Sequence, residues 1–243
     1  MSDWLHLDGG LLLATNYQNE FVLLRPAAAG EIDLPALGRA ILDMQFPFVE
    51  EVIATEVEIC LKLNERFGPD SLSSFQQLEI SQFDDSASHE SVPFRAPIWF
   101  SDADDDWTRV CEHSQLARAQ FIEHLLACRF QVAMIGFLPG FLYLNGLPAE
   151  LQVPRKENPD KRTAAGAFAI GGKYAGIYSL PSPAGWNVVG SLGVELLQTS
   201  QLPPLQLQPG DAIVLERTSD SEYEQLARHR PSLLDFNGFS NRH

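Results

Sequence analysis

Short apolar segments interrupted by glycine and proline fill the second half of the chain and limit the folds that it can adopt. Residues 134–143 read Met-Ile-Gly-Phe-Leu-Pro-Gly-Phe-Leu-Tyr, and residues 153–186 continue the same mixture. Glycine and proline weaken the interior of a strand, so this spacing indicates short strands joined by fixed turns. Glycine also lets a ligand approach backbone N–H groups closely. We therefore expect a β scaffold whose binding surface lies in these two segments.

The segments after residue 129 predict a closed barrel or a sandwich. Short apolar runs recur there at regular intervals, with Gly, Pro and Asn in the turns between them. Many short strands favour these folds because closure hides the strand edges. The expected strands are 130–135, 167–170, 175–178, 186–189, 194–197 and 212–215, the last preceded by a tight turn at 209–211. The tail that follows is expected to be a surface appendage.

The first 82 residues predict a small α+β domain. Two short strands, 11–15 and 21–24, come first, and alternation of period 2 over 57–63 is typical of a half-buried strand. Ser71 is suited to cap a helix that would follow this strand. A short amphipathic helix is expected between the two groups of strands, and its apolar positions are Leu34, Leu37, Ala40 and Ile41.

A polar segment, 83–92, is the expected linker to a second domain that spans 93–243. Pro97 interrupts the first apolar run of that domain, which predicts a strand at a sheet edge or an irregular strand. Four aspartates at 102–106 precede Trp107, and they favour the start of a helix over a cation site because carboxylates stabilise a helix N-terminus. A second helix is expected over 115–128. The chain thus predicts an α+β domain followed by a mainly β domain with two helices near its start.

The composition excludes several classes of function. The formal net charge of −15 argues against nucleic acid and against anionic membranes, because both attract basic surfaces. No apolar run approaches the roughly 20 residues that cross a bilayer, and no signal-peptide pattern begins the chain, so we expect a cytoplasmic protein. Three cysteines without paired spacing are expected to be small buried hydrophobes. The six histidines show no ligand spacing, so no metal site is predicted.

One segment reverses the sign of the charge. Between residues 155 and 173 five basic side chains accompany only Glu157 and Asp160. A basic loop in an acidic protein suggests a small anionic ligand, and the solvated tip of a hairpin would look the same. The basic residues are Arg155, Lys156, Lys161, Arg162 and Lys173.

The order of motifs from residue 136 to residue 186 resembles that of a known family. In sequence they are Gly136-Phe-Leu-Pro-Gly-Phe-Leu-Tyr143, Pro154-Arg155, Ala165-Gly166, Gly171-Gly172, Gly176-Ile-Tyr178 and Pro183-Ala-Gly-Trp186. The chain is similar to the B subunits of the bacterial 5-oxoprolinase family, which includes the sporulation-kinase inhibitor KipI and allophanate hydrolase subunit 1 (carboxyltransferase domain, subdomains C and D). The resemblance is strong over 92–217 and weaker over 10–80. It implies that the second domain is a cyclophilin-like β-barrel.

The resemblance also implies a function. The family's complex opens 5-oxo-L-proline, or here a related amide, to L-glutamate with ATP, with or without Mg²⁺, and the B chain is inactive alone. The implied partners are a cyclophilin-like C-type subunit together with a LamB/YcsF-type A subunit, and no cofactor is assigned to this chain by itself. A non-catalytic regulator that binds and inhibits a histidine kinase, as KipI does, is the alternative. A prolyl isomerase is a third reading, which only the likeness of the barrel supports.

The motifs imply a ligand-binding region, although no catalytic residue is assigned. Arg155 and Arg162 are the implied anion-binding residues, because arginine forks suit carboxylate and phosphate oxygens. Glycines would admit a ligand to the backbone, and aromatic rings would form either an apolar wall or barrel core. The candidates are Gly136, Phe137, Pro139, Gly140, Tyr143, Arg155, Arg162, Gly166, Gly171, Gly172, Tyr178, Gly185 and Trp186.

The chain departs from the family pattern at several positions and is a divergent member. Asp160 and Ser191 stand where the pattern has arginine, and Ala167 stands where it has serine. A histidine expected near the end of a helix falls at Leu125, with His124 one position earlier. Losing two arginines and a serine from one neighbourhood weakens the case for phosphoryl chemistry and favours the regulatory alternative.

Overall fold

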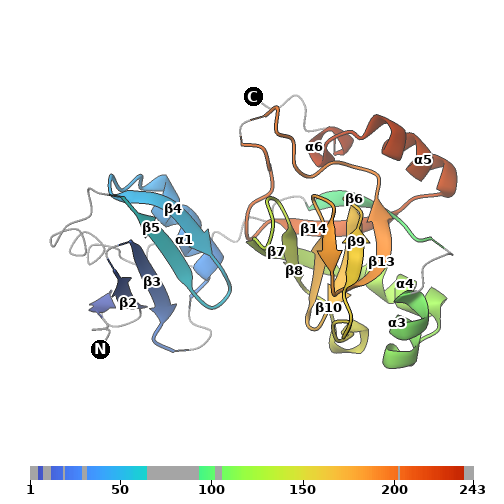
Figure 1. Cartoon of the computed structure of the whole chain (residues 1–243), viewed down its shortest axis with the longest axis horizontal. Coiled ribbons are helices and arrows are strands. Elements are labelled where there is room, and N and C mark those ends of the chain that lie inside the picture. The colour runs from blue at the N-terminus through green and yellow to red at the C-terminus, as the bar shows by residue number, and fades with distance from the viewer. Residues whose placement is uncertain are drawn as a thin grey trace. The chain divides into compact units, whose positions relative to one another are not determined.

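The computed structural model describes residues 5–7, 12–18, 20–28, 32–64, 93–101, 106–201 and 203–237. The chain divides into two compact units, Met1–Glu90 and Ser91–His243, drawn in blue and in green to red in Figure 1. The expected linker and the helix expected after Ser71 lie outside the described residues, and the expected domain boundaries stay a prediction. No described helix is both long enough and apolar enough to cross a membrane.

The first unit is a five-stranded antiparallel sheet that packs against one helix. The order of the strands is β1-β2-β3-β5-β4. The helix, α1, begins after Asp33, whose side chain accepts a hydrogen bond from the N–H of Ala36 at 3.0 Å. Its apolar face contributes Leu34, Leu37 and Ile41 to the core, as predicted. The elements are β1 (Leu5–Leu7), β2 (Leu12–Tyr17), β3 (Phe21–Pro26), α1 (Leu34–Asp43), β4 (Val49–Ala54) and β5 (Ile59–Leu63).

One expectation for this unit is wrong in part. The alternation over 57–63 is a strand only from Ile59, which is fully buried, whereas Val57 is 63% exposed. Val57 lies in the turn between β4 and β5, which Thr55 closes by exchanging backbone and side-chain hydrogen bonds with Glu58. The apolar residue at 57 therefore continues the pattern in the sequence without continuing the strand.

The second unit is built around a closed barrel of seven strands. Its order is β10-β11-β8-β7-β14-β6-β13, and β13 pairs with β10 to close it. Every pair is antiparallel except β6 with β14. A separate two-stranded sheet, β9 with β12, lies outside the barrel ladder. The strands are β6 (Phe94–Trp99), β7 (Arg129–Ile135), β8 (Leu142–Asn145), β9 (Asp160–Thr163), β10 (Ala167–Gly171), β11 (Tyr174–Ile177), β12 (Ser182–Ala184), β13 (Asn187–Leu192) and β14 (Ala212–Arg217).

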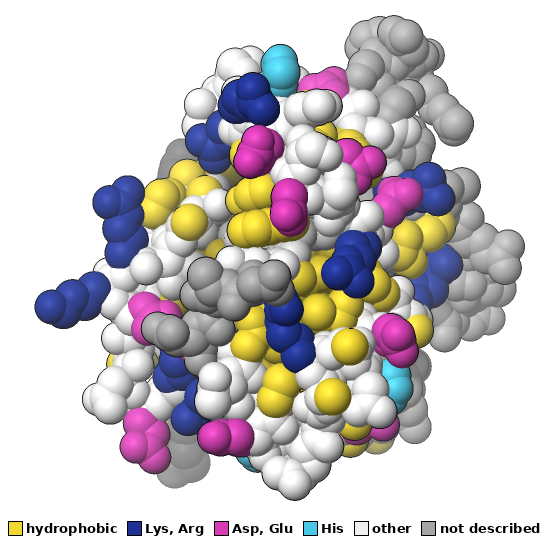
Figure 2. All heavy atoms as spheres, turned by 90° about the vertical axis from the view of Figure 1, so that its right-hand side faces the viewer, with side chains coloured by type: hydrophobic (Ala, Val, Ile, Leu, Met, Phe, Trp, Pro, Cys, Tyr) yellow, Lys and Arg dark blue, Asp and Glu magenta, His cyan; other side chains and the backbone are white. Residues whose placement is uncertain are grey.

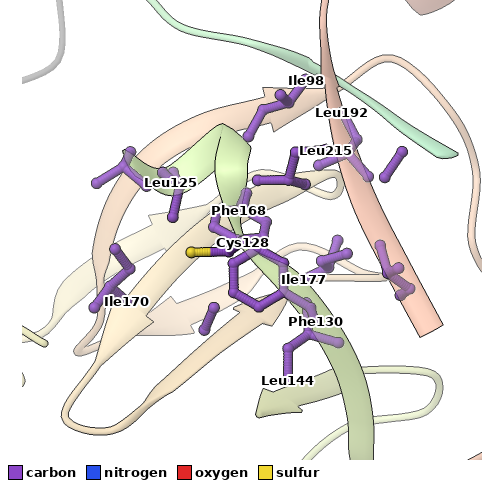
Figure 3. Packing of buried hydrophobic residues seen from close by; sticks show 14 of the residues in the cluster. Ile98, Leu125, Cys128, Phe130, Leu144, Phe168, Ile170, Ile177, Leu192 and Leu215 are labelled. Atoms are coloured by element: carbon purple, nitrogen blue, oxygen red, sulfur yellow. The ribbon is translucent and has the colours of Figure 1, made fainter. Parts of the chain in front are cut away.

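Apolar side chains fill the barrel and extend under its helices. Phe130 and Phe168 meet edge to face inside it, with ring centroids 5.7 Å apart (Figure 3). Leu125 and Cys128 belong to the same core, and burial raises the pKa of the Cys128 thiol to about 11, so this cysteine packs as a hydrophobe. The helices are α3 (Asp106–Ser114), α4 (Arg118–Ala127), the 3₁₀ turn η4 (Ala149–Leu151), α5 (Asp220–His229) and α6 (Leu233–Phe236).

Pro97 lies in a barrel strand, but on a side of β6 that β13 does not reach at this position, so the expected edge or irregular strand is confirmed in part. The N–H of Thr218 donates to the carbonyl of Ile98 at 2.9 Å, so this part of β6 bonds to β14. The backbone N–H and C=O of Arg95 instead bond to the side chain of Asn237. Pro97 has the same orientation as Arg95, and its missing N–H therefore removes no bond from the β6–β14 ladder. On that side β6 pairs with β13 only at its end.

Two further expectations for this unit are wrong. The segment 194–197 is no strand, because Glu195 and Leu197 form only isolated bridges, to Ser232 and to Leu205. Val194 and Leu196 are nevertheless buried, and their alternation is the pattern that predicted a strand. The tail is a surface appendage only in α5, which buries no residue. In α6, Leu233 is 4% exposed and belongs to the barrel core.

Candidate functional site

A second apolar layer covers the outside of the barrel where the family motifs lie. Side chains alternate across β10, so that Phe168 points into the barrel core while Ala167 and Ala169 face outward. Small residues on the outer face leave room for aromatic rings. This outer aromatic layer contains Phe141, Tyr143, Tyr174, Tyr178 and Trp186.

Two glycines admit the Trp186 ring to the surface of the barrel. A Cβ at Gly171 would lie 2.5 Å from the ring of Trp186, and one at Gly176 would lie 2.8 Å from both Trp186 and Phe141. The rings of Phe141 and Trp186 meet edge to face at 5.5 Å, and their side chains are 1% and 5% exposed. The sequence left open whether these two rings line a ligand site or pack as core, and their burial shows that they pack as core. Gly171 thus serves packing here.

Arg155 lies over this layer. Its guanidinium is 5.3 Å from the centroid of the Trp186 ring, within the range of a cation–π contact. Among the described residues it has no hydrogen bond or ion pair, and the residue is exposed. Burial raises the pKa of Tyr143, and it raises that of Tyr178 to about 12 with help from Tyr143, while Arg155 opposes both shifts. Both tyrosines are therefore neutral hydroxyl groups at pH 7 beside an unpaired cation.

The backbone of Arg155 is fixed from beneath by a buried amide. Asn187, fully buried at the start of β13, donates from Nδ2 to the carbonyl oxygens of Pro154 at 2.9 Å and Ile170 at 3.0 Å. Its Oδ1 accepts from Nε of Arg109 at 3.0 Å, and Nη2 of Arg109 donates to the carbonyl of Arg155 at 3.1 Å. The main chain at 154–155 is thereby tied to α3, β10 and β13, and only the side chain of Arg155 is left to point outward.

Lys156 is fully engaged, in contrast to Arg155. Its Nζ binds both carboxylate oxygens of Asp106, at 2.8 and 2.9 Å, and an oxygen of Asp160. The lysine side chain is 11% exposed. Burial alone would lower its pKa, but the bonds to the two carboxylates outweigh burial and raise it. Asp106 also accepts from the N–H of Val188 at 2.7 Å, so it joins α3 to β13 as well as beginning the predicted helix.

Cations lie over apolar surface more than once on this unit. Lys173 lies 4.9 Å from the centroid of the Tyr174 ring, which belongs to the same outer layer as Trp186. One face of the molecule shows hydrophobic side chains gathered at its centre with Lys and Arg side chains standing over them (Figure 2). Such surfaces suit ligands or partners that combine an anionic group with an apolar part.

A cleft of about 600 Å³ adjoins the outer aromatic layer through Tyr178, which belongs to both. Arg162 of β9 and Gly166 line it, so it contains two further candidates. Gly140 packs beside it, since a Cβ there would lie 3.2 Å from Leu197 and Ser179, which both line the cleft. Arg155 and Arg162 are thus separate features, one over the aromatic layer and one in the cleft.

Several candidate glycines use their N–H groups within the protein. Gly136 donates to the carbonyl of Phe141 at 3.2 Å, Gly166 to Tyr178 at 2.7 Å and Gly172 to Val153 at 2.8 Å. The carbonyl of Gly185 accepts from the N–H of Lys156 at 2.7 Å. The backbone groups of these four glycines thus hold the turns and strands of the site together. A ligand would therefore bind to side chains and not to these backbone groups.

Phe137 stands apart from the other aromatic candidates. Its φ of +71° is in the left-handed region, which is costly for a residue with a bulky side chain. Its ring is 67% exposed and touches Phe141 only at its edge, with centroids 5.6 Å apart. The turn is held by Ser179, whose hydroxyl donates to the carbonyl of Pro139 at 2.5 Å. The chain therefore keeps a strained backbone at an exposed aromatic residue.

Sequence patterns did not find the residues that hold Arg155 in place. Asn187 carried the one available signal, an amide inside the apolar run 186–189, where a buried polar group requires partners. Arg109 and Asp106 gave none, because their partners are 78 and 82 residues away along the chain. Within the described residues no three His, Cys, Asp or Glu side chains gather as metal ligands would. His124 pairs with Glu150 at 2.7 Å on the surface, while Leu125 is buried.

Comparisons with known proteins agree with the motifs. The family model "Carboxyltransferase domain, subdomain C and D" matches residues 22–207. The 5-oxoprolinase B subunit of Escherichia coli O157:H7 is 29% identical over 180 residues, 73% of this chain and 81% of the relative. Those of Haemophilus influenzae and Bacillus subtilis are 34% and 31% identical, and the matches cover 56% and 49% of this chain and 62% and 49% of the relatives.

Solved structures share the fold. The protein TTHA0988 superposes with a TM-score of 0.70 at 24% identity, over 82% of this chain and 40% of that one. The urea carboxylase of Kluyveromyces lactis superposes with a TM-score of 0.67 at 16% identity, over 94% of this chain and 24% of that one. The chain thus corresponds to less than half of these two larger proteins, and at such identities the likeness is one of fold.

Proposed function

The chain belongs to the carboxyltransferase subdomain C and D family together with the 5-oxoprolinase B subunits, and we propose that it is the B-type subunit of a 5-oxoprolinase-type complex. The proposed complex opens 5-oxo-L-proline, or a related cyclic amide, to L-glutamate. Its other members are a cyclophilin-like C-type subunit together with a LamB/YcsF-type A subunit. ATP, with Mg²⁺, would supply the phosphoryl group that activates the amide carbonyl for attack by water. The ring C–N bond would then break, and hydrolysis of the resulting acyl phosphate would release L-glutamate and phosphate.

The observation that carries this proposal is the unpaired guanidinium of Arg155. A lactam carbonyl is a poor electrophile, and its activation and opening place negative charge on oxygen atoms that the protein must hold. A guanidinium can bind a carboxylate or a phosphate through two parallel hydrogen bonds. Because Asn187 and Arg109 fix its backbone, Arg155 would present this fork without reorganisation, as electrostatic stabilisation requires. The neutral hydroxyls of Tyr143 and Tyr178 would add donors nearby.

The partner would cover this surface from the side of Phe137. An aromatic ring that is 67% exposed and that the chain keeps at an unfavourable φ is typical of a residue retained for contact. The outer aromatic layer lies open to solvent at Arg155, so the C-type subunit would also be the element that excludes water from the bound anion. This accounts for a B chain that is inactive alone.

The test is to reconstitute the complex from this chain and its cognate C-type and A-type subunits and to measure glutamate formation from 5-oxoproline with ATP. Loss of a charged hydrogen bond lowers kcat/KM by about 10- to 100-fold, so Arg155→Ala should fall by that factor. Arg228→Gln, a change at an exposed cation whose ion pair among the described residues is with Glu224, should leave the rate unchanged. No turnover by the wild-type complex, with a related complex active alongside, would refute the proposal.

A specific observation favours the regulatory alternative. Asp160 replaces an arginine of the family pattern, and together with Asp106 it neutralises Lys156. Neither position 156 nor position 160 therefore offers a free cation to a phosphate. A KipI-like protein needs only a docking surface, and Phe137 offers one. Autophosphorylation of the histidine kinase encoded nearest to this chain, measured with and without saturating protein, tests that reading. Unchanged autophosphorylation removes it.

A further inference from the structure

The cleft beside the outer aromatic layer carries three charged side chains that the family motifs do not explain together. Arg162, Glu195 and Arg230 all line this space of about 600 Å³. Its volume is in the range of small-molecule sites. Apolar side chains make up much of the remaining wall, among them Leu180 and Leu197. Arg230 follows the last residue of α5 and caps this helix, and it lies beyond the residues that the family model matches.

The three charges are unequally paired. The exposed side chain of Arg162 has no hydrogen bond or ion pair with any described residue. Nε of Arg230 lies 3.4 Å from Oε1 of Glu195, and the two side chains are 56% and 35% exposed. An exposed ion pair at that distance contributes little stability, so a ligand can bind to both of its members at small cost. The cleft therefore offers two guanidinium groups and one carboxylate.

The backbone holds this pair in place. The N–H of Glu195 donates to the carbonyl of Pro231 at 2.9 Å, and its own carbonyl accepts from Leu233 at 3.1 Å. Arg230 caps α5 in the left-handed conformation, with a φ of +45°, and its N–H bonds to Leu226. The side chains of Glu195 and Arg230 thus leave adjacent, anchored segments of main chain. Such anchoring lowers the entropy that a ligand must overcome on binding.

We infer that this cleft binds a small α-amino dicarboxylate, with L-glutamate as the ligand that the proposed function points to. Two guanidinium groups match two carboxylates, and the Glu195 carboxylate matches an ammonium group. The net charge of the three side chains, +1, complements the net charge of glutamate at pH 7. The inference rests on the proposed function for the identity of the ligand, but the match of charges comes from the cleft itself.

The same charges discriminate between the two sides of the proposed reaction. 5-Oxoproline has one carboxylate, and its amide nitrogen carries no charge, so it could use only one guanidinium. Opening the ring produces the ammonium group and the second carboxylate, which are the groups that the Glu195–Arg230 pair would take up. The cleft is therefore a site for the open form, separate from the Arg155 surface proposed for activation.

Calorimetric titration of the full chain, alone and with its C-type subunit, tests the inference. The probes are L-glutamate, L-glutamine, which lacks the side-chain carboxylate, 2-oxoglutarate, which lacks the ammonium group, and 5-oxo-L-proline, which lacks both. Because a hydrogen bond between charged groups is worth roughly a factor of 10 or more, L-glutamate should bind about 10-fold more tightly than each of the others. Arg230→Gln should abolish the preference for glutamate over glutamine, and Glu195→Gln the preference for glutamate over 2-oxoglutarate.

Arg228→Gln is the matched control, since it removes a cation from the same helix outside the cleft and should leave all affinities unchanged. Thermal unfolding of each variant checks its fold, and Arg230→Asn, which removes the charge and tolerates the left-handed conformation, serves if Arg230→Gln does not fold. Equal affinities for the four probes, or variants that bind as wild type does, would overturn the inference. So would binding of acidic peptides without binding of free glutamate. A complex that forms glutamate while this chain shows no preference leaves the proposed function standing and removes only the cleft.

Discussion

Replacing Asn187 tests whether a single buried amide positions the anion-binding arginine. Asn187 is fully buried and makes three hydrogen bonds, two from Nδ2 to the carbonyls of Pro154 and Ile170 and one at Oδ1 from Arg109. Asn187→Ala removes all three, which takes a partner from the Ile170 carbonyl and from a guanidinium N–H and leaves the Pro154 carbonyl with its 3.5 Å bond from Arg109. The alanine side chain is too small to fill the space.

The size of the effect follows from these contacts. A neutral hydrogen bond contributes about 1 kcal/mol and one to a charged group about 1.5–3 kcal/mol, so the three together are worth about 4 kcal/mol. For a unit of this size a loss of about 4 kcal/mol corresponds to a fall in Tm of roughly 10 °C. Arg155 would lose its fixed backbone at the same time. Reconstituted activity of Asn187→Ala should therefore fall even where the protein is still folded.

Urea unfolding followed by tryptophan fluorescence measures the stability. Gln131→Ala is the control, because Gln131 is an exposed amide of the same barrel with one bond, to Gly210 at 3.3 Å, and it should change stability by less than about 0.5 kcal/mol. Asn187→Asp keeps the acceptor for Arg109 but places a carboxylate oxygen against the carbonyl oxygens of Pro154 and Ile170, which repel it. It should therefore lower the free energy of unfolding at least as much as Asn187→Ala does. A loss below about 1 kcal/mol for Asn187→Ala would refute the reasoning.

Three further predictions follow from the outer aromatic layer and from Phe137, whose ring touches it. Gly171→Ala forces a methyl group against the Trp186 ring, so it should lower the free energy of unfolding by about 1–3 kcal/mol and shift the tryptophan emission. Gly136→Ala is its control, because a Cβ there would have no atom within 4 Å, and it should be close to neutral. Burial raises the pKa of Tyr178 to about 12, above the value of about 10 in an unfolded chain, so the free energy of unfolding should fall as pH rises from 10 towards 12. Tyr178→Phe should remove that part of the fall, as urea unfolding across this pH range would show, and no change in slope would contradict the assigned environment. Phe137→Gly should raise Tm, because glycine relieves about 1 kcal/mol of strain at a positive φ, and yet reduce the affinity for the C-type subunit, by about 10-fold or more in a pull-down titration.

The barrel could be predicted because its signal is local. In β10, Phe168 faces the core and the neighbouring alanines face outward, and this alternation is visible in five residues of sequence. The same reasoning failed at 194–197, since Leu196 is as deeply buried in an irregular segment as it would be in a strand. Hydrophobic periodicity reports burial, and hydrogen-bond partners decide whether a buried segment is a strand.

The candidate site could be predicted only in its outline. Glycines and aromatic residues at fixed spacing located the outer layer, but they did not separate Phe137, which is exposed, from Phe141, which is buried. The side chains that fix Arg155 come from α3 and β13, far along the chain in both directions, so no local pattern reveals them. Pro97 shows the same limit, because its neighbour β14 follows it by more than one hundred residues.

The structure shows what replaces the arginine of the family pattern at position 160. Asp160, which reverses the sign at this position, combines with Asp106 to bind Lys156, and a lysine that is 11% exposed has no donor left for a ligand. The substitution therefore converts part of a basic loop into a rigid support and leaves Arg155 as the outward cation next to it. Arg230, which caps α5 outside the family match, brings another guanidinium to the adjoining cleft. If this redistribution preserves function, restoring arginine at position 160 should loosen the loop through repulsion with Lys156 and lower the activity of the complex rather than raise it.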